Sequence, residues 1–217
     1  MPTDLTVRTR PSAVRRTGPP DGARDFGGDG DGRRGGTPGA PAHVVMTGLA
    51  FALAGVTMLF VAFTTTYLGH LQASEWRPIP RPWVLWPDTV ILLASSAAVE
   101  WGRRRLKVGD LAGLRRGLTT GAALGVLFLA GQLLAWRLLA QQGVYLSSHP
   151  HSSFYYLLTG AHGTHLLGGL VAFAVILPRA WRGAYAPPAA NAVTATSIYW
   201  HFLTGLWLYV FAILFWA

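Results

Sequence analysis

The chain has no cysteine, and only 12% of its 217 residues are charged. The lack of cysteine excludes disulfides, thiolate metal sites, iron–sulfur clusters and cysteine nucleophiles. The charged fraction is about half of that in a typical soluble domain, whereas 51% of the residues are apolar. Nucleophile–base pairs, phosphate-binding loops and HExxH arrangements are missing as well. The composition therefore predicts an integral membrane protein rather than a stand-alone enzyme.

Residues 1–42 differ in composition from the rest of the chain. They hold seven Arg, five Asp and many Gly and Pro, with few bulky apolar residues. Such a segment buries too little apolar surface to offset the entropy that ordering it would cost. We expect residues 1–42 to form a disordered tail and residues 43–217 to form the membrane domain.

Five apolar stretches follow the tail, each long enough to cross a hydrocarbon core about 30 Å thick as a helix. The alternating pattern typical of β-barrels is missing, so helices are the expected spanning structure. The predicted fold class is an all-α integral membrane protein, a bundle of five transmembrane helices at about 44–68, 83–101, 117–136, 154–177 and 192–217.

The basic residues set the expected orientation of this bundle. The tail and the second and fourth loops carry 15 Lys and Arg, against 3 in the first and third loops. The positive-inside rule then places the N-terminus in the cytoplasm and the C-terminus outside. Topology and anionic lipid thereby explain the isoelectric point of about 10.8, and no nucleic-acid partner is expected.

Two stripes of small residues predict where helices pack closely. The third span has Gly117, Gly121 and Gly125 four residues apart, and the fourth span repeats the pattern from Gly160 to Gly168. Small residues at this spacing let helix backbones approach one another in lipid. We expect both stripes to pack within the bundle, with contact to a partner subunit as the alternative.

Ionisable residues inside a membrane are costly, so each of them is a functional candidate. His162 and His165 lie three residues apart in the fourth span, a spacing that predicts one shared face, and His201 lies in the fifth span. Neutral imidazole is a good ligand for iron and copper. We expect His201 several ångströms away from the other two along the membrane normal, which favours hydrogen bonding over ligation of a haem or metal. A proton relay is the third reading.

Three other polar residues lie in the apolar stretches. Gln132 interrupts the third span and is expected to bond across to a neighbouring helix. Asp88 and Glu100 lie at the two ends of the second span, where solvation is less costly, with Glu100 beside Arg103 and Arg104. Both acids are expected to be interfacial anchors rather than proton carriers.

Four segments resemble subunit III of the haem–copper oxidases. The stretch at 154–169 reads FYYLLTGAHGTHLLGG and is similar to that family's FY-x-LTG-x-HG-x-H-x-x-x-G signature, while 199–207 reads YWHFLTGLW and resembles YWHF-x-D-x-x-W. Supporting matches are GVLFLAGQLLAW at 125–136 and DTVILLASS at 88–96, the latter like NT-x-LL-x-SS. Together they cover four of the five spans in the family's order.

The resemblance implies a subunit that itself binds no haem and no copper, since both belong to partner subunits. It implies packing on subunit I, in a complex with subunit II, in the bacterial inner membrane, where the subunit holds phospholipid and supports proton uptake and stability during turnover. The family's motif positions are then structural, with no catalytic, cofactor-binding or metal-binding residue among them: His162, His165, Trp200, His201, Gln132, Gly160, Gly168 and Gly169.

This chain departs from the family pattern in three places. A buried glutamate of the family, two positions before a Met, is Val56 here, and the acid after the family's WHF-x is Thr204. Many members also have seven helices, of which this chain has five. The proton roles of those acids therefore do not transfer, and the host complex is left open between a cytochrome c oxidase, a quinol oxidase and a nitric oxide reductase. A di-histidine membrane cytochrome and a small transporter or assembly factor are the alternatives from other classes.

Overall fold

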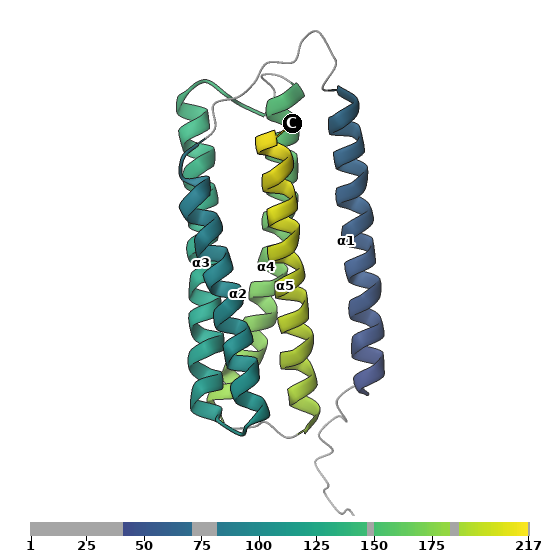
Figure 1. Cartoon of the computed structure of the whole chain (residues 1–217), viewed down its shortest axis with the longest axis vertical. Helices are drawn as coiled ribbons and strands as arrows, with labels where there is room; N and C mark the ends of the chain where they lie inside the picture. The colour runs from purple at the N-terminus through teal and green to yellow at the C-terminus, as the bar shows by residue number, and fades with distance from the viewer. Residues whose placement is uncertain (1–40, 71–81, 147–149, 183–186, 217) are drawn as a thin grey trace, which may run out of the picture. The chain divides into compact units, whose positions relative to one another are not determined.

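The computed structural model describes residues 41–70, 82–146, 150–182 and 187–216. Within these ranges the chain forms five α-helices and no β-strand (Figure 1). The helices are α1 (Ala42–His70), α2 (Leu85–Lys107), α3 (Leu111–Gln141), α4 (Pro150–Trp181) and α5 (Pro187–Trp216). The all-helical class predicted from the sequence is confirmed. The predicted tail, residues 1–42, lies outside the described residues except for its last two.

Four helices of the described chain, α1, α3, α4 and α5, are long and apolar enough to cross a membrane. Helix α2 is not apolar enough to count as such a span, because Asp88, Glu100 and a basic last turn lower its mean hydropathy. A helix satisfies its own backbone hydrogen bonds, as a segment in lipid must. The described residues therefore form a membrane helical bundle with four crossings supported by composition, and a crossing by α2 stays a prediction.

The turn between α2 and α3 fixes these two helices as antiparallel neighbours. Gly109 has a φ of 77°, in the left-handed region that glycine adopts at little cost. Asp110 then caps α3, because its Oδ1 accepts a hydrogen bond from the backbone N–H of Gly113 at 2.8 Å. The two helices that this short turn joins form the most extensive helix–helix contact in the described chain.

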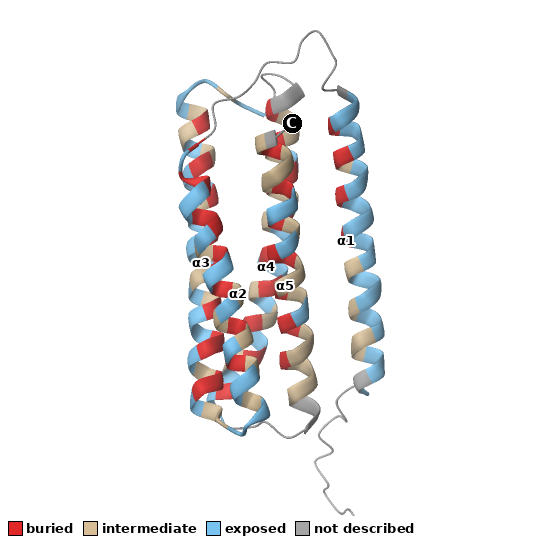
Figure 2. Ribbon diagram, viewed as in Figure 1, coloured by how far each residue is buried: buried red, intermediate tan, exposed pale blue. Residues whose placement is uncertain are grey.

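Helices α2, α3, α4 and α5 close a ring, since each of them packs on the next and α5 packs back on α2. Large side chains fill the space that the ring encloses, among them Phe128, Phe173, Trp200 and Trp207. Figure 2 shows the buried residues as red stripes on these helices. The ring therefore has a core of its own, into which the polar side chains discussed below project.

Helix α1 packs on α4 and α5, and within the described residues it has no contact with α2 or α3 (Figure 1). Its buried residues recur every three or four positions, at Val56, Phe60, Thr64 and Tyr67. The Phe60 ring meets the ring of His165 in α4 edge-on, at 6.0 Å between centroids. The rest of the α1 surface is largely exposed (Figure 2), so one narrow stripe attaches this helix to the others.

The two predicted stripes of small residues lie in different surroundings. In α3, a Cβ added at Gly117 would lie 2.5 Å from the Cα of Gly102 in α2, so the two backbones touch. In α4, by contrast, Thr164 and Gly168 are exposed and Gly160 is only half-buried. The α4 stripe therefore makes no close backbone contact of the kind seen in α3, although a Cβ at Gly160 would lie 3.5 Å from the Trp136 ring of α3. The inward face of α4 carries larger side chains instead: Tyr155, Leu158, His162 and Leu166.

Candidate functional site

Trp200 of α5 ties together the other three helices of the ring. Its indole N–H donates to the Oγ of Ser95 in α2 at 3.0 Å, and the Ser95 hydroxyl donates to the carbonyl of Gly121 in α3 at 2.7 Å. A Cβ at Gly125 of α3 or at Gly169 of α4 would lie 2.6 or 2.8 Å from carbons of the Trp200 ring. The two glycines therefore make the space that the indole fills.

A second indole, two turns further along α5, repeats the pattern. The N–H of Trp207 donates to the Oγ1 of Thr89 in α2 at 2.9 Å. Its ring lies against Phe128 of α3 and His162 of α4, at 5.0 and 5.2 Å between centroids. Because seven residues make about two helical turns, Trp200 and Trp207 point from the same face of α5.

Trp207, Ser95 and Thr89 are site residues that the sequence motifs contain but do not mark as contacts between helices. A signal was nevertheless present in the spacing of the residues. Two tryptophans seven residues apart in one span, and two hydroxyl side chains six residues apart in another, are spaced so that two antiparallel helices can pair them. These spacings are compatible with both hydrogen bonds, but they do not fix which faces of the two helices meet.

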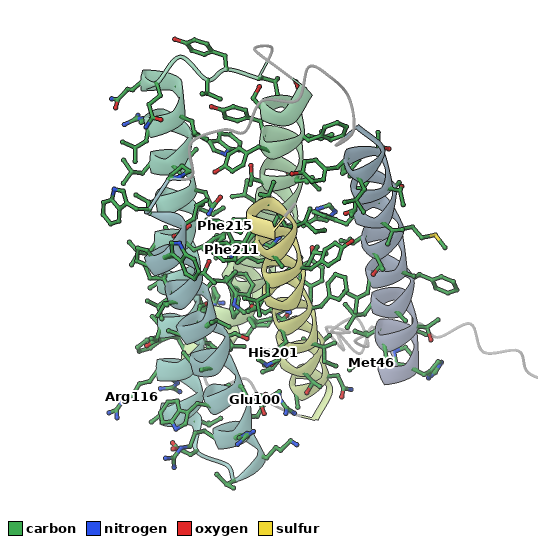
Figure 3. All side chains as sticks on the ribbon, turned by 45° about the horizontal axis from the view of Figure 1, so that its top comes forward. Met46, Glu100, Arg116, His201, Phe211 and Phe215 are labelled. Atoms are coloured by element: carbon green, nitrogen blue, oxygen red, sulfur yellow. The ribbon has the colours of Figure 1, made fainter. Side chains whose placement is uncertain are left out.

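His201 joins α5 to the C-terminal half of α2. Its Nδ1 lies 2.5 Å from the Oγ of Ser96, and its Nε2 lies 3.3 Å from the Oγ of Ser197 and 3.4 Å from the Oε2 of Glu100. Figure 3 shows Glu100 and His201 on neighbouring helices at the same end of the ring. Both ring nitrogens thus have polar partners. Because two of these partners, Ser96 and Glu100, belong to α2, the imidazole connects α2 to α5.

Glu100 also binds two arginines of its own helix. Arg103 donates to both carboxylate oxygens, through Nε at 2.7 Å and Nη2 at 2.8 Å, and Arg104 donates through Nε at 2.8 Å. The Glu100 side chain is 22% exposed and that of Arg104 is 74% exposed. This open, ion-paired setting agrees with the interfacial anchor that the sequence predicts at Glu100.

Asp88 does not fit the same prediction. It is only 1% exposed, and the Nε2 of Gln132 in α3 donates to its Oδ2 at 2.6 Å. A Cβ at Gly131 would collide with its Oδ1, so that glycine leaves the space in which the carboxyl lies. The expectation of a solvated anchor is therefore wrong, because a place near a helix end does not fix which face of the helix turns inward. Gln132 does bond across to a neighbouring helix.

The histidine pair of α4 points to different neighbours. His162 is fully buried against Phe128 and Trp207, and neither of its ring nitrogens has a hydrogen-bond partner among the described residues. The Nδ1 of His165 lies 2.7 Å from a carbonyl of its own helix, and its ring meets Phe60 of α1. Three residues rotate a helix by about 300°, which leaves two side chains about 60° apart. The two histidines are therefore neighbours on α4, as the spacing predicts, but they contact different helices.

The three membrane histidines are also separated along the bundle. His201 precedes Trp207, which His162 contacts, by six residues, or about 9 Å of helix. In the part of the chain that the structure describes, no three His, Cys, Asp or Glu side chains are placed to hold a metal ion. The contacts that His165 and His201 do make, to a carbonyl, hydroxyls and a carboxylate, are those of side chains that join or brace helices.

The fold and these contacts define a class of protein, a membrane helical bundle whose polar side chains contact one another across helices. The chain belongs to the cytochrome c oxidase subunit III family, whose model matches residues 42–217. The resemblance inferred from the motifs is thereby confirmed.

Curated relatives from several bacteria agree with this assignment. A probable cytochrome c oxidase subunit 3 of Mycobacterium tuberculosis is 33% identical over 178 residues, which cover 80% of this chain and 88% of that protein. One of Nocardia farcinica is 34% identical over 175 residues, covering 78% and 86%. The cytochrome c oxidase subunit 3 of a Synechocystis species is 31% identical over 179 residues, covering 78% and 74%.

The structure also shows what occupies the two positions where the resemblance leads one to expect acids. Val56 is buried in the stripe by which α1 packs on its neighbours. Thr204 is buried too, and its hydroxyl donates to the carbonyl of Trp200 in its own helix at 3.0 Å. Neither side chain titrates, so neither position can hold the proton that an acid there would hold.

Proposed function

We propose that this chain is a non-catalytic subunit III of a bacterial haem–copper terminal oxidase, located in the inner membrane. It packs on subunit I in a complex that includes subunit II, and those partners hold the haem and copper at which electron transfer and oxygen reduction occur. The observation that carries the proposal is the family match over residues 42–217. The site supports a structural role, because Trp200, Trp207 and His201 each form a polar contact with a side chain of α2.

The proposal includes five crossings with the N-terminus in the cytoplasm, residues 1–42 as a cytoplasmic tail and residues 43–217 as the membrane domain. The Nε of Arg115 donates to the carbonyl of Ala180 at 2.9 Å, and its guanidinium lies 5.8 Å from the centroid of the Trp181 ring. The basic residues around the α2–α3 turn and at the end of α4 thus gather at one end of the bundle. The positive-inside rule supports a cytoplasmic place for that end. A crossing by α2 is supported by its packing between α3 and α5.

Lipid and subunit I cover the outer faces in this proposal. Phe51 and Met58 of α1 are 76% and 75% exposed in the isolated chain. Side chains that contact acyl chains or another subunit in the membrane are expected to be exposed in this way. A groove of about 330 Å³ between α1 and the α4–α5 pair, lined by Leu49, Gly168 and Tyr199 among others, offers a place for an acyl chain. The subunit acts as a scaffold that orders lipid and water beside subunit I, and so supports proton uptake and stability.

The first test is copurification from mildly solubilised membranes with a tag on the full chain. Partners and the reduced-minus-oxidised spectrum are recorded on the same sample. We expect haem bands only where a large second chain copurifies, and the haem type then narrows the host enzyme. Haem that stays with the isolated 23.4 kDa chain would overturn the proposal, and so would the absence of both haem and a large partner in several mild detergents.

The second test is the His201→Phe variant, which removes the α2–α5 contact while keeping a ring of similar size. We expect weaker retention of the subunit in the complex, because Ser96 and Glu100 of α2 lose their contact with the imidazole of α5. Turnover per haem of intact complex is expected to change little. His165→Phe is the matched control, because its Nδ1 contacts a carbonyl within α4 and not α2. A large loss of turnover per haem in fully assembled complex would contradict a structural role.

A further inference from the structure

Asp88 is an acid inside the bundle with a single hydrogen bond. Its Oδ2 accepts from the Nε2 of Gln132, while its Oδ1 has no partner among the described residues. The ion pairs of the described chain involve Glu100 and Asp110, and none of them reaches Asp88. The carboxyl is therefore buried without a cation and with half of its acceptor atoms unused.

The groups around Asp88 provide no charge from any neighbouring helix. On α3 it faces the amide of Gln132 and the backbone of Gly131. On α4 the titratable groups on the inward face are the hydroxyl of Tyr155, which lies within electrostatic reach, and the buried ring of His162. On α5 the indole of Trp207 donates to the neighbouring Thr89 and not to the carboxyl.

An ionised carboxylate in this setting would be costly. Burial of a charge without a counter-charge is unfavourable even after the surroundings relax, which is why buried acids are paired or hold a proton. One neutral amide donor does not replace the shell of water that a carboxylate loses. A neutral carboxylic acid loses far less hydration free energy on burial, provided that its hydroxyl has a hydrogen-bond acceptor.

Such an acceptor belongs to the same pair of side chains. The Oε1 of Gln132 is buried and, like the Oδ1 of Asp88, has no partner among the described residues. Both unpartnered atoms are acceptors when the acid is ionised, so neither can satisfy the other. A single proton on the carboxyl turns one of them into a donor.

We propose that Asp88 and Gln132 form a proton-binding site within the bundle, a carboxylic acid–carboxamide pair joined by two hydrogen bonds. The carboxylate takes up one proton, and the resulting O–H donates to the Oε1 of Gln132 while the Nε2 of Gln132 donates to the other carboxyl oxygen. All four polar atoms are then satisfied without a cation. Gly131 serves this site by leaving room for the carboxyl beside α3.

Infrared spectroscopy of the purified full chain tests the site directly, because a protonated carboxyl has a carbonyl stretch that a carboxylate lacks. At neutral pH we expect one such band per chain that shifts in D₂O and is lost in Asp88→Asn, a variant that keeps the shape and an amide pair. Glu100→Gln, which changes the ion-paired acid of the same helix, is the matched control and should keep the band. Loss of a carboxylate band in Asp88→Asn, with no carbonyl band lost, would overturn the proposal.

A second variant keeps the test decisive if Asp88→Asn fails to fold. Gln132→Met has a side chain of similar length without an acceptor oxygen. We expect the carbonyl band to stay at full intensity, because the acid holds its proton, but to shift in frequency because its hydrogen bonds change. A band that neither shifts nor loses intensity in Gln132→Met would overturn the pairing. The measurement needs no partner subunit, so it stands apart from the proposed role in an oxidase.

Discussion

The two acids of α2 are twelve residues apart, about 18 Å along the helix, and their surroundings are opposite. Glu100 contacts two arginines and a histidine and is partly exposed, whereas Asp88 contacts one amide and is buried. Two of the partners of Glu100, Arg103 and Arg104, are three and four residues further along its own helix. The partner of Asp88 comes from α3. Residue spacing in the sequence reveals partners on the same helix, such as the arginines of Glu100, and not a partner on another helix, such as that of Asp88.

The α2–α3 contact also differs between its Glu100 end and its Asp88 end. Near Glu100 the helices touch backbone to backbone, at Gly102 and Gly117. Near Asp88 the carboxyl itself lies between α2 and the backbone of Gly131. A side chain can move aside when a neighbour grows, and a helix backbone cannot. The ends should therefore respond differently when a methyl group is added to α3.

The largest effect is expected from Gly117→Ala. The added methyl group would meet the backbone of Gly102, so α2 and α3 must separate, at a cost of about 1–3 kcal/mol of stability. Thermal unfolding of the purified chain in detergent measures it. Gly205→Ala is the matched control, because no atom lies within 4 Å of the Cβ that it would add. Equal unfolding midpoints for the two variants would show that the backbone contact is not tight.

A smaller effect, about 1–2 kcal/mol, is expected from Gly131→Ala, because the side chain of Asp88 can rotate away from the new methyl group. The same unfolding measurement applies. In the double variant Gly131→Ala with Asp88→Ala the collision is gone, so the two changes should be non-additive by at least about 0.5 kcal/mol. Strictly additive midpoints would mean that the carboxyl and the glycine do not share this space.

The smallest effects on stability are expected at the two arginines beside Glu100. Arg103→Ala removes the bidentate partner, whose side chain is 23% exposed, and should cost about 0.5–1 kcal/mol. Arg104→Ala removes a side chain that is 74% exposed and should cost less than about 0.5 kcal/mol. Raising the salt concentration should shrink both losses. A larger loss for Arg104→Ala than for Arg103→Ala would reverse the assigned order of the two pairs.

The helices and the α3 stripe could be predicted from the sequence because apolar length and small-residue spacing belong to one segment at a time. The direction in which each helix faces could not. In lipid the outward side of a helix is as apolar as the inward side, so the periodicity that marks the core in a soluble protein is weak. For that reason the burial of Asp88 and the outward turn of Thr164 and Gly168 were both missed. The sequence likewise marks His162 and His201 as polar groups in apolar spans, but it does not identify the residues that surround them.

The position of Trp200 has a consequence for how the chain is made. Helix α5 follows the other helices in the sequence, and domains assemble from the N-terminal side during synthesis. Until α5 enters the membrane, Ser95 has no indole to accept from, and the hollows at Gly125 and Gly169 have no ring to fill them. Because Trp200 contacts α2, α3 and α4, the contacts that join three of the four earlier helices can form only after α5 has been synthesised.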